Sequence, residues 1–111
     1  MSDKDHANLL AILDSVDKIE RYISKFKDAD DLYEDDLRYD AVLMNFINIG
    51  EAVTRLPLVI TEQIDVPWNQ IRGFRNLIAH NYFGVDAEEL WQTINENLPP
   101  LSEEINNFLD K

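Results

Sequence analysis

The chain has 111 residues, of which 45% are hydrophobic and 29% charged, values typical of one globular domain rather than of a disordered chain. Ten Lys and Arg against 22 Asp and Glu give a net charge of −12, which argues against a protein that coats nucleic acid through a general positive charge. The absence of cysteine excludes disulfides and thiolate metal sites. We expect one domain, residues 1–111. Its polar N-terminus and lack of a long apolar run predict a cytoplasmic protein that does not bind membranes.

The first half of the chain predicts two long helices. Apolar residues recur at spacings of three and four from Leu9 to Phe26, after Ser2 as the N-cap, which is the pattern of an amphipathic helix. Asp28 to Asp31 is expected to be a solvated acidic loop. A second helix is predicted from about Asp35 to Leu56. Gly50 is costly inside a helix, so we expect close packing against another helix there.

The second half predicts two more long helices. Pro57 ends the second helix, and residues 58–64 fit a short helical turn. A third long helix should begin at Pro67 and end near Tyr82, before the helix breaker Gly84. Asp86 and Glu89 form a capping box for a fourth, which Pro99-Pro100 should kink or split. The expected fold is all-α, an up-down four-helix bundle with a short extra helical turn between helices 2 and 3.

Charge is distributed unevenly along the chain. Residues 1–37 and residues 86–111 each carry a net charge of −6, whereas residues 38–85 are neutral and all their basic groups are arginines. Residues 66–85 contain no Asp or Glu at all. Such a segment in so acidic a protein is the first place to expect a binding site for an anion.

The third predicted helix divides into two faces. Ile71, Phe74, Leu77 and Ile78 form the face expected to be buried. The opposite face carries the candidate site residues. Arg72, Asn76 and His80 follow one another at spacings of four, and Arg75 lies about 140° from His80 on the helical wheel. These candidate site residues are Arg72, Arg75, Asn76 and His80.

The residue types of this face narrow the possible chemistry. With two histidines, no cysteine and no carboxylates beside His80, a metal site is improbable. An arginine that stabilises phosphorane charge and a histidine that moves protons would suffice for attack of an RNA 2′-hydroxyl on its own phosphate. That reaction needs one group to take a proton and another to deliver one. Since one chain supplies one suitable histidine, a homodimer with a shared cleft is the chemical expectation.

Spacing alone leaves a second interpretation open. Arg72 and Arg75 could pair with the acidic ends of the chain while His80 caps the helix. On the second helix, Asn48, Glu51 and Arg55 likewise form a stripe that is typical of a solvated face with an ion pair.

The segment Arg75-Asn-Leu-Ile-Ala-His80-Asn81-Tyr82 resembles the Arg-x4-His-x-Tyr motif of the HepT-like toxins, a branch of the HEPN superfamily. The resemblance extends in the family's order over residues 38 to about 105, which is more specific than the motif alone. The further segments are Arg38-Tyr-Asp-Ala-Val, Ile49-Gly-Glu-Ala52, Arg55-Leu-Pro57, Pro67-Trp68, His80-Asn-Tyr-Phe-Gly84, and Trp91 with Leu98-Pro99.

The resemblance implies a HEPN four-helix bundle that dimerises and acts as a metal-independent endoribonuclease toxin, with no cofactor. It implies that Arg75 and His80 are catalytic and that Asn81 lies beside them, with Glu51 facing the same cleft. It also implies a partner, an MntA-like minimal nucleotidyltransferase antitoxin that transfers AMP from ATP to Tyr82. Adding an anionic phosphodiester beside the cleft would repel RNA.

Two positions depart from the family pattern. Many relatives carry Arg where this chain has Met44, and many carry Asp at the position of Asn81. The first change removes a cation from the expected cleft, and the second alters how His80 is oriented. The alternative function is a non-catalytic helical binding partner, or substrate-binding subunit, of a minimal nucleotidyltransferase. A purely structural dimeric bundle is the third.

Overall fold

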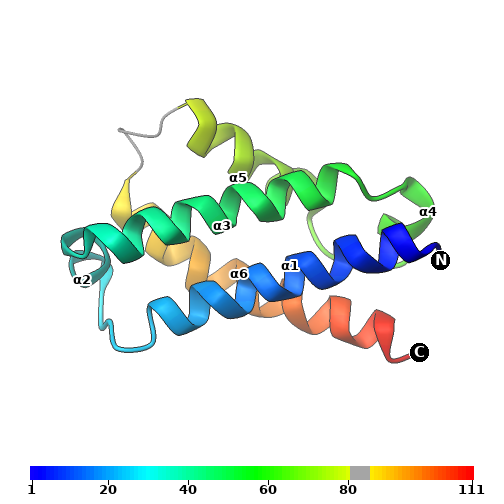
Figure 1. The fold of residues 1–111 in the computed structure, drawn as a ribbon, viewed down its shortest axis with the longest axis horizontal. Coiled ribbons are helices and arrows are strands. Elements are labelled where there is room, and N and C mark those ends of the chain that lie inside the picture. Colours follow the sequence, from blue (N-terminus) through cyan, green and yellow to red (C-terminus); the bar gives the residue numbers. More distant parts are fainter. Residues whose placement is uncertain (81–85) are drawn as a thin grey trace.

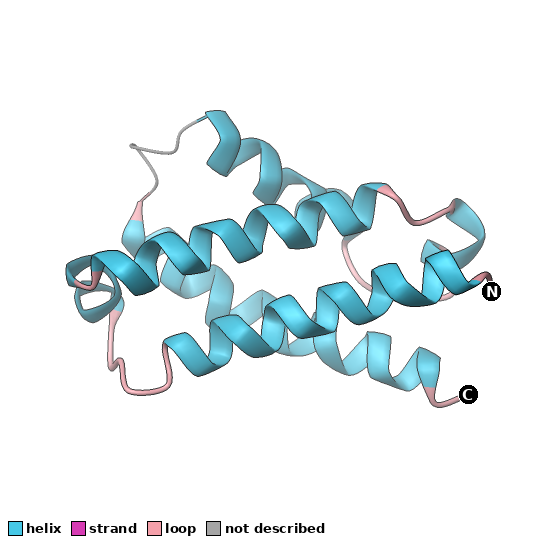
Figure 2. Ribbon diagram, viewed as in Figure 1, coloured by secondary structure: helices cyan, strands magenta, loops and turns pink. Residues whose placement is uncertain are grey.

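The computed structural model describes residues 1–80 and 86–111; within residues 68–80 the side chains of residues 76, 77, 79 and 80 are not described. The described residues form six helices and no strand (Figures 1 and 2). The helices are α1 (Asp3–Tyr22), α2 (Ala29–Glu34), α3 (Asp36–Thr54), α4 (Leu58–Thr61), α5 (Trp68–His80) and α6 (Ala87–Leu109).

The four long helices alternate in direction, and both termini lie at the same end of the molecule (Figure 1). α1 packs against α3, α3 packs against α5, and α6 packs against α1 and α2. This arrangement is the predicted up-down bundle, with α4 as the predicted short turn between the second and third long helices. α3 therefore lies between α1 and α5 and forms the support on which α5 rests.

The predicted apolar stripes form one continuous core. Leu9, Ile12 and Ile19 of α1 are fully buried, and on α5 Ile71 and Ile78 are 1% and 2% exposed. The stripe of α3 contributes Val42, Leu43, Phe46, Ile49 and Val53, and that of α6 contributes Leu90, Ile94, Leu98, Leu101 and Ile105. Burial of these side chains is the main favourable contribution to folding, because each removes a large apolar surface from water.

Side-chain caps begin the long helices as the sequence indicates. The Ser2 hydroxyl accepts a hydrogen bond from the Asp5 amide at 3.1 Å, and Asp86 accepts one from the Glu88 amide at 2.9 Å. Asp35 caps α3 by accepting from the Arg38 amide at 3.0 Å. That amide, and then the Arg38 guanidinium at 2.7 Å, hold the pKa of Asp35 below its ordinary value. A carboxylate here also favours the positive end of the helix dipole.

Two expectations from the sequence are wrong. The segment from Asp28 to Asp31 is not a solvated loop: Asp28 caps the short helix α2, in which Ala29 and Leu32 are buried. Because most residues around these two apolar side chains are acidic, the sequence pattern does not predict this helix.

The second wrong expectation is the split at Pro99-Pro100, one of the two outcomes, a kink or a split, that the sequence predicts there. α6 is continuous from Ala87 to Leu109. The two prolines cannot donate to the carbonyls of Asn95 and Glu96, one turn earlier. All four residues are exposed, so water can solvate these carbonyls, and buried Leu98 and Leu101 hold both halves of the helix to the core.

The connection before α5 is fixed by a buried tryptophan. The indole Nε1 of Trp68 donates to the carbonyl oxygens of Thr61 and Ile64, each at 3.0 Å. α5 begins at Trp68, one residue after the predicted Pro67. Trp68 thus ties the start of α5 to the α4 turn and satisfies its own buried N–H.

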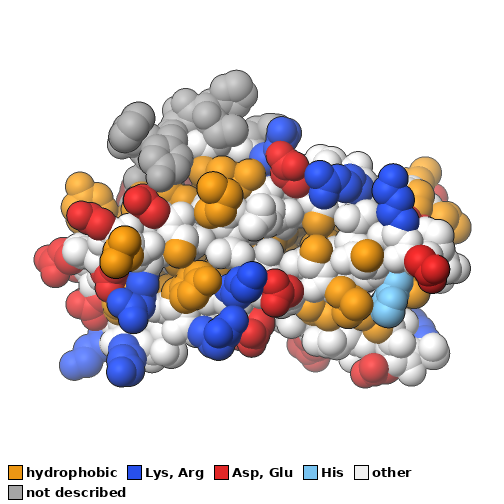
Figure 3. Space-filling model, viewed as in Figure 1, with side chains coloured by type: hydrophobic (Ala, Val, Ile, Leu, Met, Phe, Trp, Pro, Cys, Tyr) orange, Lys and Arg blue, Asp and Glu red, His pale blue; other side chains and the backbone are white. Residues whose placement is uncertain are grey.

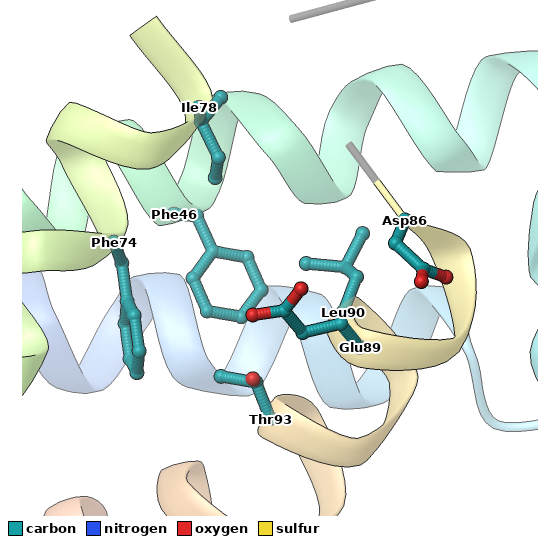
Figure 4. A pocket seen from close by; sticks show the side chains of 7 residues that line it. All are labelled: Phe46, Phe74, Ile78, Asp86, Glu89, Leu90 and Thr93. Atoms are coloured by element: carbon teal, nitrogen blue, oxygen red, sulfur yellow. The ribbon is translucent and has the colours of Figure 1, made fainter. Parts of the chain in front are cut away.

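A small apolar hollow of about 20 Å³ lies between α3, α5 and the start of α6. Figure 4 shows Phe46, Phe74, Ile78 and Leu90 around it, with Asp86 and Glu89 on one side. Phe46 and Phe74 meet edge to face with ring centroids 5.4 Å apart. In the described residues, none of the helices has the length and apolar character needed to cross a membrane.

Candidate functional site

The backbone of α5 approaches α3 closely where Arg75 faces Gly50. A Cβ built on Gly50 would overlap the Cβ of Arg75 and would lie 3.3 Å from its Cα and 3.4 Å from its Cγ. The predicted close approach at Gly50 is therefore confirmed. Because no larger residue fits, Gly50 sets the distance between the two helices at the residue expected to act on RNA.

The guanidinium of Arg75 is bound by Glu51, the residue that follows Gly50 on α3. Arg75 donates from Nε to Oε1 of Glu51 at 3.2 Å, a contact between residues 24 positions apart in the sequence. The other carboxylate oxygen of Glu51, Oε2, accepts from Nη2 of Arg55 at 3.4 Å. The structure thus brings Glu51 to Arg75, a contact that the sequence pattern does not predict, and confirms the ion pair of Glu51 with Arg55.

These three side chains carry two positive charges and one negative charge, a net charge of +1. The side chains of Arg75 and Glu51 are 43% and 40% exposed, and that of Arg55 is 56% exposed. They are therefore open to a ligand from solvent. The bond of Arg75 to Glu51 uses Nε and not the two outer Nη groups, which are the groups that bind an anion in a bidentate manner.

Arg72 has a different partner. Its Nη1 donates to Oδ1 of Asn69 at 3.1 Å within the first turns of α5. The partners of Arg72 and Arg75 thus belong to the neutral central part of the chain, and the interpretation that these arginines pair with the acidic ends is wrong for the described contacts.

The remaining predicted residues are placed only in part. Asn76 and His80 belong to α5, but their side chains are outside the described residues, and Asn81 and Tyr82 lie outside them altogether. The helix backbone fixes one relation: with a rise of about 1.5 Å per residue, His80 follows Arg75 by about 7.5 Å along the axis. On α3, the side chain of Met44 is 57% exposed, so this position is at the surface.

A surface groove between α1 and α3 begins at this site. It is lined by small or polar side chains, and Glu51 and Arg55 form part of its wall. Lys18 lines it from α1, where its Nζ lies 3.1 Å from Asp14. Figure 3 shows both basic and acidic side chains on this side of the molecule. The other lining residues are Ala11, Asp14, Ser15, Asn48 and Ala52, so the charged side chains of the groove are two basic and two acidic.

Two mid-helix glycines provide a direct test of the close approach at Arg75. Gly50→Ala should destabilise the fold by about 1–3 kcal/mol, because the strain of the new Cβ outweighs the better helix propensity of alanine. Gly73→Ala is the matched control, since a Cβ there meets nothing within 4 Å. It should stabilise the fold by about 0.5–1 kcal/mol. Urea denaturation measures both. Equal effects of the two substitutions would show that α5 does not need Gly50.

In the described part of the chain, no group of three or more His, Asp or Glu side chains is placed to hold a metal ion. The described side chains at Arg75 are two guanidiniums and one carboxylate. Guanidiniums are well suited to phosphate, because they stay charged and present paired donors.

Comparisons with known proteins agree with the motif. A family model described as "Ribonuclease HepT-like" matches residues 12–108. "Probable ribonuclease HepT" of Thermococcus cleftensis is 31% identical over 101 residues, which are 90% of this chain and 89% of that protein. "Putative RNase TTE0752" of Caldanaerobacter subterraneus subsp. tengcongensis is 35% identical over 83 residues, 74% of each chain.

A third relative is longer. "Gamma-glutamylcyclotransferase and putative RNase MJ0434" of Methanocaldococcus jannaschii is 34% identical over 101 residues, which are 90% of this chain but 45% of that protein. No solved structure matches the chain. The family model covers nearly the whole sequence, and the helical bundle has the architecture expected of HEPN proteins. The chain therefore belongs to the HepT-like ribonuclease family.

Proposed function

We propose that this protein is a metal-independent endoribonuclease and the toxin of a toxin–antitoxin pair, with its active site at a homodimer cleft. The observation that carries the proposal is that α5 of a HepT-like ribonuclease holds Arg75 in place against α3 and carries His80 five residues later. Arginine and histidine are the two groups that cleavage through the 2′-hydroxyl requires.

In the proposed reaction, the 2′-oxygen attacks the adjacent phosphorus and the bond from phosphorus to the 5′-oxygen breaks. His80 of one protomer accepts the 2′-hydroxyl proton, and His80 of the partner subunit delivers a proton to the leaving 5′-oxygen. Arg75 stabilises the charge that develops on the phosphorane oxygens. The products are a 2′,3′-cyclic phosphate and a 5′-hydroxyl. Arg72, Asn76 and Asn81 support this site.

We propose that the antitoxin is a minimal nucleotidyltransferase that silences the toxin at Tyr82. The phenol oxygen of Tyr82 attacks the α-phosphorus of ATP, pyrophosphate leaves, and the tyrosine carries AMP. The added phosphodiester is anionic, so it repels an RNA phosphate from the neighbouring arginines. Intact mass after co-expression with the nucleotidyltransferase should rise by whole AMP units, and Tyr82→Phe should remove that rise.

The direct test is incubation of the purified protein with RNA in excess EDTA. We expect fragments that end in a 2′,3′-cyclic phosphate and begin with a 5′-hydroxyl, and a specific activity that falls on dilution as the dimer dissociates. RNA that stays intact would contradict the ribonuclease proposal. If the same protein then bound a nucleotidyltransferase, it would support the alternative of a non-catalytic partner subunit.

A further inference from the structure

We propose that Arg55 is a second phosphate-binding residue of this site and that Glu51 holds Arg55 and Arg75 side by side as one receptor for the RNA backbone. The proposal rests on the proposed ribonuclease function and adds to it a residue that the Arg-x4-His motif does not include.

The first observation is the double use of one carboxylate. Oε1 of Glu51 accepts from Arg75 at 3.2 Å and Oε2 accepts from Arg55 at 3.4 Å. A single Glu51–Arg75 pair would cancel the charge of the arginine that must attract a phosphate. Because Arg55 also binds Glu51, the three groups keep a net charge of +1 while both guanidiniums are oriented.

The second observation is the position of Arg55 at the surface. It lies one turn after Glu51, just beyond the end of α3, with a side chain that is 56% exposed. Arg55 also lines the groove between α1 and α3, whose small side chains Ala11, Ser15 and Ala52 leave room for a bound chain. A phosphate next to the one held by Arg75 can therefore meet Arg55 without displacing the core.

The third observation concerns charge. On α3, the residue one full heptad before Glu51 is the uncharged Met44, which is 57% exposed, so this part of the surface has no cation from that position. A chain with a net charge of −12 repels RNA at long range, so it needs basic groups concentrated where the backbone binds. The pair of arginines on Glu51 supplies a second cation at the active site.

The test measures binding of a single-stranded RNA whose 2′-oxygens are methylated, so that it cannot be cleaved. Arg55→Gln should weaken binding by roughly three- to tenfold at low salt, and it should reduce the slope of log K against log salt by about 0.7, the value for one lost phosphate contact. With cleavable RNA, the loss should appear in KM rather than in kcat.

Arg21→Gln is the matched control. Arg21 is also exposed and pairs with a carboxylate four residues away, Asp17, at 3.1 Å. Arg21→Gln changes the net charge of the chain by the same amount as Arg55→Gln. Arg21 lies on α1, outside the groove. Its salt slope should equal that of the wild type. An equal slope for Arg55→Gln, or an equal loss in both variants, would overturn the proposal.

Glu51→Gln separates orientation from attraction. The neutral amide removes the negative charge, so RNA binding should stay equal or become tighter, while kcat should fall at least tenfold because Arg75 loses its fixed position. An unchanged kcat would overturn the positioning role of Glu51. Since the methylated RNA measures binding without cleavage, failure of this inference is distinct from failure of the ribonuclease proposal.

Discussion

Replacing His80 with alanine is expected to lower the rate of RNA cleavage by about 10²–10⁴-fold, the range that a general acid or base contributes. His80 is the only histidine on α5, and the proposed dimer has one from each protomer to accept and to deliver a proton. The substitution therefore removes both proton-transfer groups at once. Initial rates on a defined RNA in EDTA measure the effect.

His6→Ala is the matched control for this variant. His6 is exposed near the start of α1, so its loss should leave the rate and the stability unchanged. Circular dichroism and urea denaturation should show that His80→Ala keeps the wild-type fold. A His80→Ala protein that cleaves RNA at more than a tenth of the wild-type rate would contradict a role for His80 in proton transfer.

Substitutions of Arg75 should also lower the rate of RNA cleavage. Arg75→Ala should lower kcat by about 10²–10³-fold, as the loss of one group that stabilises transition-state charge does elsewhere. Arg75→Lys should restore little of the kcat that Arg75→Ala loses. A lysine cannot bind Glu51 with one donor and present two further paired donors to a phosphate. If both residues act in one step, the double variant with His80→Ala should be hardly slower than the worse single variant.

Local patterns in the sequence predict the helices and much of the core. The spacing of Leu9, Ile12 and Ile19, or of Phe46, Ile49 and Val53, follows from helix geometry alone, and each of these residues is buried. The ion pair of Glu51 with Arg55 is likewise predictable, since it joins neighbours within one turn. Such contacts depend only on the local conformation of the chain.

The contact between Arg75 and Glu51 depends on tertiary packing instead. The two residues are 24 positions apart, and their meeting requires the close approach of α5 to α3 at Gly50. The resemblance to the family implies that Glu51 faces the cleft, but only the structure shows that its carboxylate binds Arg55 and Arg75 at the same time. α2 was missed because it is short and mostly acidic, and its burial is decided by its contacts with α6 and α3.

Replacing Phe46 with alanine is expected to lower the free energy of unfolding by about 3–5 kcal/mol, the usual cost of deleting a buried aromatic ring. Phe46 is 1% exposed and packs edge to face against Phe74 of α5. It also lines the hollow of about 20 Å³ between α3, α5 and α6 (Figure 4), so the deleted ring would enlarge a space that is already present. Urea denaturation at an unchanged m-value measures the loss.

Phe108→Ala is the matched comparison, because Phe108 is half-buried near the end of α6 and does not line the hollow beside α5. It should cost less stability and leave cleavage by the folded protein unchanged. Phe46→Ala should also lower the rate of RNA cleavage at temperatures where the variant remains folded. α5 packs on α3 beside this ring, and a catalytic side chain such as Arg75 must stay within about 0.5 Å of its productive position, which requires that packing to be intact. A folded Phe46→Ala protein with wild-type kcat would show that the position of Arg75 depends on Gly50 and Glu51 alone.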